Sequence, residues 1–321
     1  MHMQSTEQKM ALVLGATGGI GGAVARNLLK RGWHIKALTR DIGKAGKTAG
    51  DFEWIAGDAL NPVDVSKAAE GVSLIVHAVN PPGYRDWEKL VVPMLDNTIA
   101  AAKQAGARVL LPGTVYNFGP DAFPVLGEDS PQHPVTRKGR LRVMMEQRLK
   151  DASASGLDVL IVRAGDFFGP KAANNWFSQG LVTPGKPVSL VSNPSRRGIG
   201  HQWAFLPDVA ETMAQLVDRA ETLPRFAVYH MEGFWDADGM QMAAAIRRVV
   251  GRPVKIRSFP WWIVPIMAPF NAFMHELKEM RYLWKQPLRM TNTRLVGVLA
   301  AEPRTPIDEA VRQTLADLGC L

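Results

Sequence analysis

The stretch Gly15-Ala-Thr-Gly-Gly-Ile-Gly21 decides the fold of this chain. It follows the apolar run Met10–Leu14 and precedes a helix-like stretch at 22–30. Glycines between a strand and a helix permit a tight turn and close approach to a pyrophosphate, and the helix N-terminus offers its unpaired N–H groups. Ordinary strands also end in glycine turns, so the pattern needs its context. The residues expected to contact a dinucleotide here are Gly15, Thr17, Gly18, Gly19, Ile20 and Gly21.

The rest of the first half alternates apolar runs with helical patterns. Short runs rich in Val, Ile and Leu predict strands at 10–14, 34–39, 52–55, 73–79, 108–111 and 157–162. Apolar residues three and four apart predict helices at 22–30, 64–70, 87–104 and 138–153. This alternation is typical of a parallel sheet covered by helices on both faces. We therefore predict an α/β fold, a Rossmann-type doubly wound parallel sheet with a smaller C-terminal substrate lobe.

The alternation breaks after Gly169-Pro170, where prolines become frequent. Further helices are expected at 208–220 and 240–250, and further strands at 227–231 and 254–258. We predict a dinucleotide-binding core over 1–165, to which segments near 201–232 return. The remainder, 166–321, is expected to form mainly the substrate lobe.

Composition excludes several classes of protein. The 321 residues are 46% hydrophobic and 21% charged, which is enough apolar material for a sizeable core. The single cysteine, Cys320, excludes a disulfide framework, and the seven histidines show no metal-ligand spacing. The net charge of +8 is spread along the chain without a nucleic-acid motif. The first residues lack the apolar core of a secretory signal. We expect a cytoplasmic protein without a metal and without a nucleic-acid or membrane partner.

The longest apolar stretch is FPWWIVPIMAPFNAF, at 259–273. It contains three prolines and falls short of the roughly 20 residues that a membrane-spanning helix needs. A buried or capping segment is one interpretation. A hydrophobic lid or a subunit contact, as in a homodimer, is another, and a membrane-surface role is a third.

Several further motifs, taken in order, resemble the short-chain dehydrogenase/reductase superfamily in its extended or atypical branch, which includes NAD-dependent epimerases and dehydratases. Besides the glycine stretch they are Gly57-Asp58, the segment at 77–80, Gly113-Thr114 with Phe118-Gly119, the segment at 162–170, the segment at 206–210 and that at 305–310. The resemblance covers nearly the whole chain. It implies a nicotinamide cofactor, with Asp58 on the adenine amino group, Ala59 beside it, and Ala78, Val79 and Asn80 behind the cofactor. A turn or helix-cap role is the alternative for Asp58.

Arg40 follows the second expected strand and bears on the choice of cofactor. A carboxylate at that position of a dinucleotide fold binds the ribose 2′-hydroxyl, whereas an arginine accommodates a 2′-phosphate. Arg40 therefore favours NADP, with NAD as second choice, although Asp41 beside it leaves room for a surface ion pair.

The expected reaction centre departs from the family pattern. Active relatives carry a Tyr four residues before a Lys on one helix, but Lys138 and Arg142 stand at those positions here. In one interpretation Lys138 is a substitute acid or an electrostatic clamp on the substrate oxygen; Arg142 would depress its pKa and also bind the nicotinamide ribose. In the other, Arg142 pairs with Glu146, Lys138 is solvated, and no catalysis occurs.

Other side chains offer alternatives to the missing Tyr. Tyr116 follows Thr114 at the carboxyl end of the fifth expected strand, where ligands bind in open α/β sheets, and Tyr84 follows the fourth. Thr114 is the better candidate to hold the substrate oxygen. Asp166 is expected either to face the substrate or, as we prefer, to pair with Arg163.

Together these residues predict an NADP-dependent oxidoreductase that transfers hydride to or from a small, largely apolar carbonyl or hydroxyl substrate. The expected pocket is aromatic, with Trp176, Phe177, Trp203, Trp261 and Trp262. Two alternatives stay open: a non-catalytic NADP-binding sensor, which the missing Tyr favours, and an NAD-dependent epimerase or dehydratase.

Overall fold

The computed structural model describes residues 9–45, 51–80, 87–172, 175–270 and 272–321. The chain divides into two compact units. Unit 1 comprises Met1–Pro112, Met144–Val162 and Met213–Val228, and unit 2 comprises Gly113–Val143, Arg163–Thr212 and Tyr229–Leu321.

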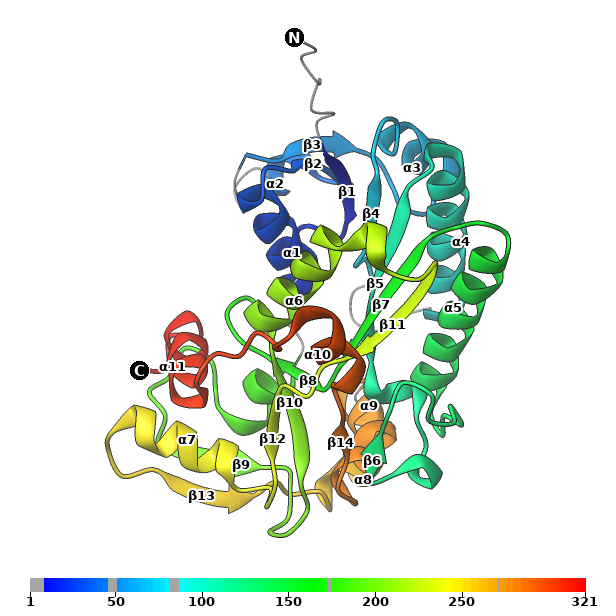
Figure 1. Ribbon diagram of the computed structural model, residues 1–321. Helices are drawn as coiled ribbons and strands as arrows, with labels where there is room; N and C mark the ends of the chain where they lie inside the picture. The colour runs from blue at the N-terminus through cyan, green and yellow to red at the C-terminus, as the bar shows by residue number, and fades with distance from the viewer. Residues whose placement is uncertain (1–8, 46–50, 81–86, 173–174, 271) are drawn as a thin grey trace. The chain divides into compact units, whose positions relative to one another are not determined.

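Unit 1 is built on a sheet of seven strands in the order β11-β7-β5-β4-β1-β2-β3 (Figure 1). The strands are β1 (Met10–Leu14), β2 (His34–Thr39), β3 (Glu53–Ala56), β4 (Leu74–His77), β5 (Arg108–Thr114), β7 (Val159–Ala164) and β11 (Phe226–His230). β1 runs parallel to β2 and β4, β2 to β3, and β4 to β5. The order reverses direction at β1, as in a doubly wound sheet. The predicted fold class is confirmed.

Helices cover both faces of this sheet, which explains why its strands are apolar throughout. Residues Ala11 to Leu14 of β1 and all of β4 are buried. Figure 1 shows α1 on one side of the sheet and α3 and α4 on the other. The helices of the first part of the chain are α1 (Gly19–Lys30), α2 (Ile42–Ala45), α3 (Pro62–Ala68), α4 (Trp87–Ala105), α5 (Arg137–Ala154) and α6 (Leu206–Asp218).

Helix ends differ most from the sequence expectation. α1 begins at Gly19, three residues before the expected start, because glycines that carry no apolar signal form its first turn. α3 begins after Asn61, whose side chain accepts a hydrogen bond from the Val63 N–H, with Pro62 in the first turn. The glycine turn and the Asn61-Pro62 cap determine the residue at which each helix begins, and apolar periodicity alone does not detect them.

Unit 2 contains three small sheets, ordered β12-β10-β8, β13-β9 and β14-β6. Their strands are β6 (Val125–Leu126), β8 (Asp166–Phe168), β9 (Leu190–Asn193), β10 (His201–Phe205), β12 (Phe234–Asp236), β13 (Lys255–Ser258) and β14 (Arg289–Met290). The helices are α7 (Gln241–Val250), α8 (Ile263–Met267), α9 (Ala272–Met280), α10 (Thr293–Leu299) and α11 (Ile307–Asp317). An aromatic core holds them together, and its most buried rings are Phe118, Phe168, Phe177, Trp203 and Trp284.

A buried pair of basic side chains lies within this core. Nη1 of Arg163 lies 3.0 Å from Nε2 of His230 and donates to the Glu128 carbonyl oxygen. The Arg163 guanidinium also lies 5.3 Å from the centre of the Phe118 ring. Burial, reinforced by the charge of Arg163, lowers the pKa of His230 to about 3. His230 therefore stays neutral and can accept the hydrogen bond of Arg163.

This pair predicts an acid sensitivity of the fold. Below pH 6.5 the unfolded chain binds a proton at His230 that the folded chain excludes, so stability falls as pH falls. Between pH 6.5 and about 5 the free energy of unfolding should drop by about 2 kcal/mol through this group. His230→Gln should flatten the pH dependence of denaturant unfolding, and His275→Gln, at an exposed site, should not. Equal pH slopes for wild type and His230→Gln would contradict the assignment.

Candidate active site

The predicted cofactor loop forms a glycine cradle between β1 and α1 of unit 1. Gly15 adopts a φ of +90°, and a Cβ there would lie 2.5 Å from the carbonyl oxygen of Ala78. A Cβ on Gly21 would overlap the Gly15 carbonyl. The turn closes with a hydrogen bond from the Gly18 N–H to the Gly15 oxygen, at 2.9 Å. Only glycines allow the ends of β1 and β4 and the first turn of α1 to lie this close.

The N-terminus of α1 faces this cradle with unpaired backbone donors. Its N-cap is Gly18, which makes no side-chain capping bond, and its first turn contains no carboxylate. The N–H groups of Gly19, Ile20 and Gly21 therefore lack intrahelical partners and carry the positive end of the helix dipole. Thr17 and Gly18 are exposed. Such a cradle suits a pyrophosphate, because backbone N–H groups at the positive end of a helix dipole bind anions.

The other predicted cofactor residues follow neighbouring strands of the same sheet. Arg40 is exposed directly after β2. Asp58, after β3, accepts the Leu60 N–H at 3.0 Å, so it has the turn role that the sequence left open. Ala59 is buried and its carbonyl oxygen accepts a hydrogen bond from Asn97.

Ala78, Val79 and Asn80 follow β4, and Asn80 is exposed. His77, which precedes them, is buried with Nδ1 2.8 Å from the Thr98 hydroxyl. Its packing fits a structural role.

In unit 2, Thr114 and Tyr116 lie where β5 ends. Thr114 is half-buried, and its hydroxyl accepts the Tyr116 N–H at 3.2 Å. The first turn of α5 lies against this point, because a Cβ on Gly139 would overlap the Tyr116 carbonyl oxygen. Lys138 and Arg142 stand one helical turn apart at this end of α5, and both are buried. Their burial does not fit the interpretation of Lys138 as a solvated residue.

A buried polar chain starts at Tyr116, and the sequence analysis did not assemble it. The Tyr116 hydroxyl donates to Oδ1 of Asp166 at 3.3 Å, and Oδ2 of Asp166 lies 2.9 Å from Nε2 of His201. The preferred pairing of Asp166 with Arg163 was therefore wrong: Arg163 bonds His230 instead. No local signal joins these residues, since Asp166 and His201 are 35 positions apart and meet only because β8 pairs with β10.

The chain continues into the aromatic core of unit 2. The His201 ring stacks on Trp284, with 3.6 Å between the ring centres, and lies edge-on to Trp203. Three buried atoms of these rings have no hydrogen-bond partner among the described residues: His201 Nδ1, Trp203 Nε1 and Trp284 Nε1. Burial, and to a lesser extent the Asp166 carboxylate, raises the pKa of nearby Tyr282, so its hydroxyl stays neutral.

The aromatic residues predicted to line the pocket differ in their exposure to solvent. Trp176 and Phe177 are buried and Trp261 is half-buried, but Trp262 is 69% exposed and does not line this core. Tyr84 lies outside the described residues. The described part of the chain contains no cluster of His, Cys, Asp and Glu suited to a metal ion. Within the same ranges, no helix is both long and apolar enough to cross a bilayer.

Comparison with known proteins agrees with this geometry. A family model described as NAD(P)H-binding matches residues 15–186. Protein y4nL of Sinorhizobium fredii is 29% identical over 218 residues, which are 60% of this chain and 60% of y4nL. The NAD(P)H azoreductase of Xenophilus azovorans is 27% identical over 252 residues, 77% of this chain and 76% of the azoreductase. The chain spans about half to three fifths of the length of several curated relatives that it matches.

Solved structures show the same fold at lower identity. The Bordetella bronchiseptica enzyme WbmH, solved in complex with NAD+, aligns with a TM-score of 0.71 at 16% identity, covering 97% of this chain and 98% of WbmH. The family match covers more than half of the sequence and begins at Gly15, the first residue of the glycine cradle. The chain belongs to the NAD(P)H-binding family.

Proposed function

We propose that this protein is an NADP-dependent oxidoreductase that acts on a small, largely apolar carbonyl or hydroxyl compound. The observation that carries the proposal is the glycine cradle at α1, which has the geometry to hold a pyrophosphate. Residues 1–165, with returning segments near 201–232, would serve the cofactor, and most of 166–321 the substrate. A cytoplasmic location and a homodimer remain predictions.

Residues of the turn before α1, of the loops after β2, β3 and β4, and of α5 would hold the cofactor. Gly18, Gly19, Ile20 and Gly21 would bind the pyrophosphate through backbone N–H groups, with Gly15 and Thr17 shaping the turn. Arg40 would bind a 2′-phosphate, Asp58 and Ala59 the adenine, and Ala78, Val79 and Asn80 the back of the cofactor. Arg142 would bind the nicotinamide ribose. The nicotinamide, when bound, supplies or accepts a hydride.

The chain itself must provide the proton that accompanies the hydride. During carbonyl reduction the substrate oxygen gains a proton, which Lys138 would donate as an ammonium group and recover from water afterwards. Tyr116 is the alternative donor, and its hydroxyl is already oriented by Asp166. Thr114 would hold the substrate oxygen in either case.

The aromatic core of unit 2 supports an apolar substrate with a polar atom. Phe168, Phe177 and Trp203 are buried in this core, and the buried indole N–H groups of Trp203 and Trp284 are donors without a partner among the described residues. A carbonyl oxygen is an acceptor that would suit such donors. The names of two relatives, an NAD(P)H azoreductase and a 3-diazoavenalumate denitrifying reductase, favour reduction over epimerisation.

Two other functions keep specific support. The replacement of Tyr and Lys by Lys138 and Arg142 favours a non-catalytic NADP-binding sensor. The structural neighbours include a UDP-galactose 4-epimerase, with a TM-score of 0.68, which keeps an NAD-dependent epimerase or dehydratase open.

Cofactor choice is tested at Arg40. Arg40→Ala should weaken NADPH binding about tenfold to a hundredfold, because a charge-assisted contact to phosphate is lost, while NADH binding should change little. The measurement is a fluorescence titration of both cofactors, with Lys30→Ala as a control at the far end of α1. Equal loss for both cofactors, or equal affinities in the parent protein, would refute the preference for NADP.

The cradle is tested at Gly18, whose backbone is extended and tolerates a side chain. A Cβ there would lie 3.2 Å from the Gly15 oxygen, a tight contact that a small shift of the turn relieves, and its methyl group would meet the pyrophosphate. We expect a loss of NADPH affinity of about tenfold or more, and the thermal midpoint is measured beside it to show that the variant is folded. Gly297→Ala, at a helical glycine with open space around it, is the matched control. Retained tight binding by Gly18→Ala would show that the cradle does not hold the cofactor.

The proton donor is tested at α5 and β5 after a screen of carbonyl compounds with NADPH. Lys138→Met should lower kcat by about 10²–10⁴ with little effect on cofactor affinity. Arg142→Ala should weaken cofactor binding instead, and Lys150→Met, exposed on the same helix, should do neither. A loss confined to Tyr116→Phe would transfer the role to Tyr116. Tight NADPH binding without turnover of any compound would favour the sensor.

A further inference from the structure

An exposed apolar face lies on α8 of unit 2 and the turn that follows it. Phe270 is 85% exposed, Trp262 69%, Ile266 57% and Met267 39%. Trp262, Ile266 and Phe270 are four residues apart, so they recur on one side of a helical run. Among the described residues Phe270 and Trp262 are the most exposed large apolar side chains. A contiguous exposed patch of this kind marks a binding surface more often than scattered single residues do.

The opposite side of the same segment is firmly attached to unit 2. Val264 and Ala268 are buried. Nε1 of Trp261 donates to the Pro194 carbonyl oxygen at 2.8 Å, and its ring contacts Trp176 and Phe259. The inward side chains therefore attach this segment to unit 2. The outward side chains, Trp262, Ile266 and Phe270, stay exposed and can contact a partner.

The charged residues from Gly239 to Met274 are all basic. From Gly239 to Met274 the chain contains no Asp, Glu or His, but it contains Arg247, Arg248, Arg252, Lys255 and Arg257. Arg248 is bonded to Asp308. Arg252 donates to the Val188 carbonyl oxygen.

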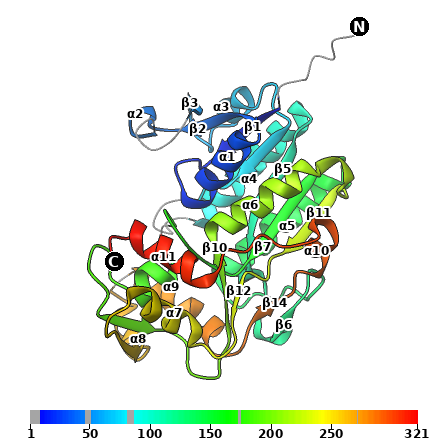
Figure 2. The same cartoon turned by 60° about the vertical axis from the view of Figure 1, so that its left-hand side comes forward.

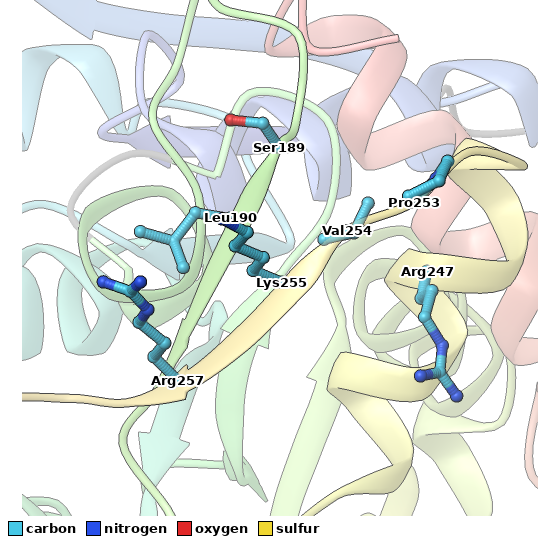
Figure 3. Close-up of a pocket in the computed structure, with 7 residues that line it drawn as sticks. All are labelled: Ser189, Leu190, Arg247, Pro253, Val254, Lys255 and Arg257. Atoms are coloured by element: carbon cyan, nitrogen blue, oxygen red, sulfur yellow. The ribbon is translucent and has the colours of Figure 1, made fainter.

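The remaining three cations line an open groove of about 570 Å³ (Figure 3). Arg247 stands on α7, and Lys255 and Arg257 on β13. All three are exposed. The rest of the lining is Ser189, Leu190, Pro253 and Val254, so the groove combines cations with apolar surface and contains no carboxylate. Figure 3 shows Arg257 beside Leu190, with Arg247 on the far side of Val254. The cations are spread along the groove, which suits an anionic surface better than one small anion.

The apolar face and the basic groove belong to one end of unit 2. Arg257 precedes Trp262 by five residues, and Figures 1 and 2 both show α7 and α8 toward the same end of this unit. α8 and its turn are too short to span a bilayer, so they can only lie on its surface. We propose that this end of unit 2 docks on an anionic phospholipid membrane, with Trp262, Ile266 and Phe270 at the headgroup boundary and Arg247, Lys255 and Arg257 on lipid phosphates.

The charge favours a membrane over a second copy of the chain. Two copies would bring basic surfaces together in a protein with a net charge of +8, and these surfaces would repel each other. On a membrane, anionic headgroups would pair with the cations and the acyl boundary would bury the aromatic rings. The proposal departs from the expectation of no membrane partner, and it does not depend on the cofactor or the reaction.

The test is sedimentation with vesicles of phosphatidylcholine alone or with 30% phosphatidylglycerol, using the full chain. The wild type should bind the anionic vesicles at least about tenfold more tightly than the neutral ones, with binding reduced by salt. The double variant Trp262→Ser/Phe270→Ser and the double variant Lys255→Glu/Arg257→Glu should each lower binding to anionic vesicles about tenfold or more. Circular dichroism and the thermal midpoint check that both fold.

Matched controls lie in unit 1. Val63→Ser removes an apolar side chain that is 55% exposed, and Lys67→Glu/Lys103→Glu reverses two exposed cations. Neither variant should change the affinity for anionic vesicles by more than about twofold. Equal loss in the controls, or no binding to anionic vesicles by the wild type, would overturn the proposal. A dimer in analytical ultracentrifugation that Trp262→Ser/Phe270→Ser converts to monomer would overturn it in favour of a second copy.

Discussion

The contact between the Gly15–Gly21 turn and the end of β4 is the constraint on which unit 1 depends. A side chain at Gly15 or Gly21 would occupy the position of a backbone carbonyl. Because these two positions carry no side chain, the chain can turn tightly from the end of β1 at Leu14 to the start of α1 at Gly19. The same absence of side chains leaves the first N–H groups of α1 accessible to an anion. One local feature thus fixes both the beginning of the doubly wound sheet and the place where a dinucleotide is expected to bind.

The sequence predicts the sheet better than the site. β1 and β2 have the predicted bounds: the buried residues of β1 form one apolar run, and those of β2 are Ile35, Ala37 and Leu38, interrupted by Lys36. Thr114 and Tyr116 could be placed at the carboxyl edge of the sheet, since that edge follows from strand order. The link from Tyr116 through Asp166 to His201 could not, because it joins β5, β8 and β10 and depends on tertiary pairing. The neighbours Trp261 and Trp262 have the same residue type and opposite environments, a difference set by packing against Trp176 and Pro194.

The interior of unit 2 shows two ways to bury an ionisable group. Asp166 is buried with two polar partners, a phenol and an imidazole, whereas Arg163 is held by a neutral histidine, a carbonyl oxygen and the face of an aromatic ring. Buried charges need such hydrogen bonds, because an unpaired charge in an apolar interior is costly. Both arrangements fix the side chains at the ends of β7, β8 and β10. They therefore give the aromatic core a polar border whose side chains are hydrogen-bonded.

The composition of the segment from Gly239 to Met274 has a consequence for its behaviour in solution. Its only ionisable side chains are those of Arg and Lys, and neither type titrates near neutral pH. The charge of this stretch is thus constant across the pH range in which cells operate. Protonation cannot adjust what the segment attracts, so its electrostatic interactions respond to ionic strength and to the charge of the other surface alone.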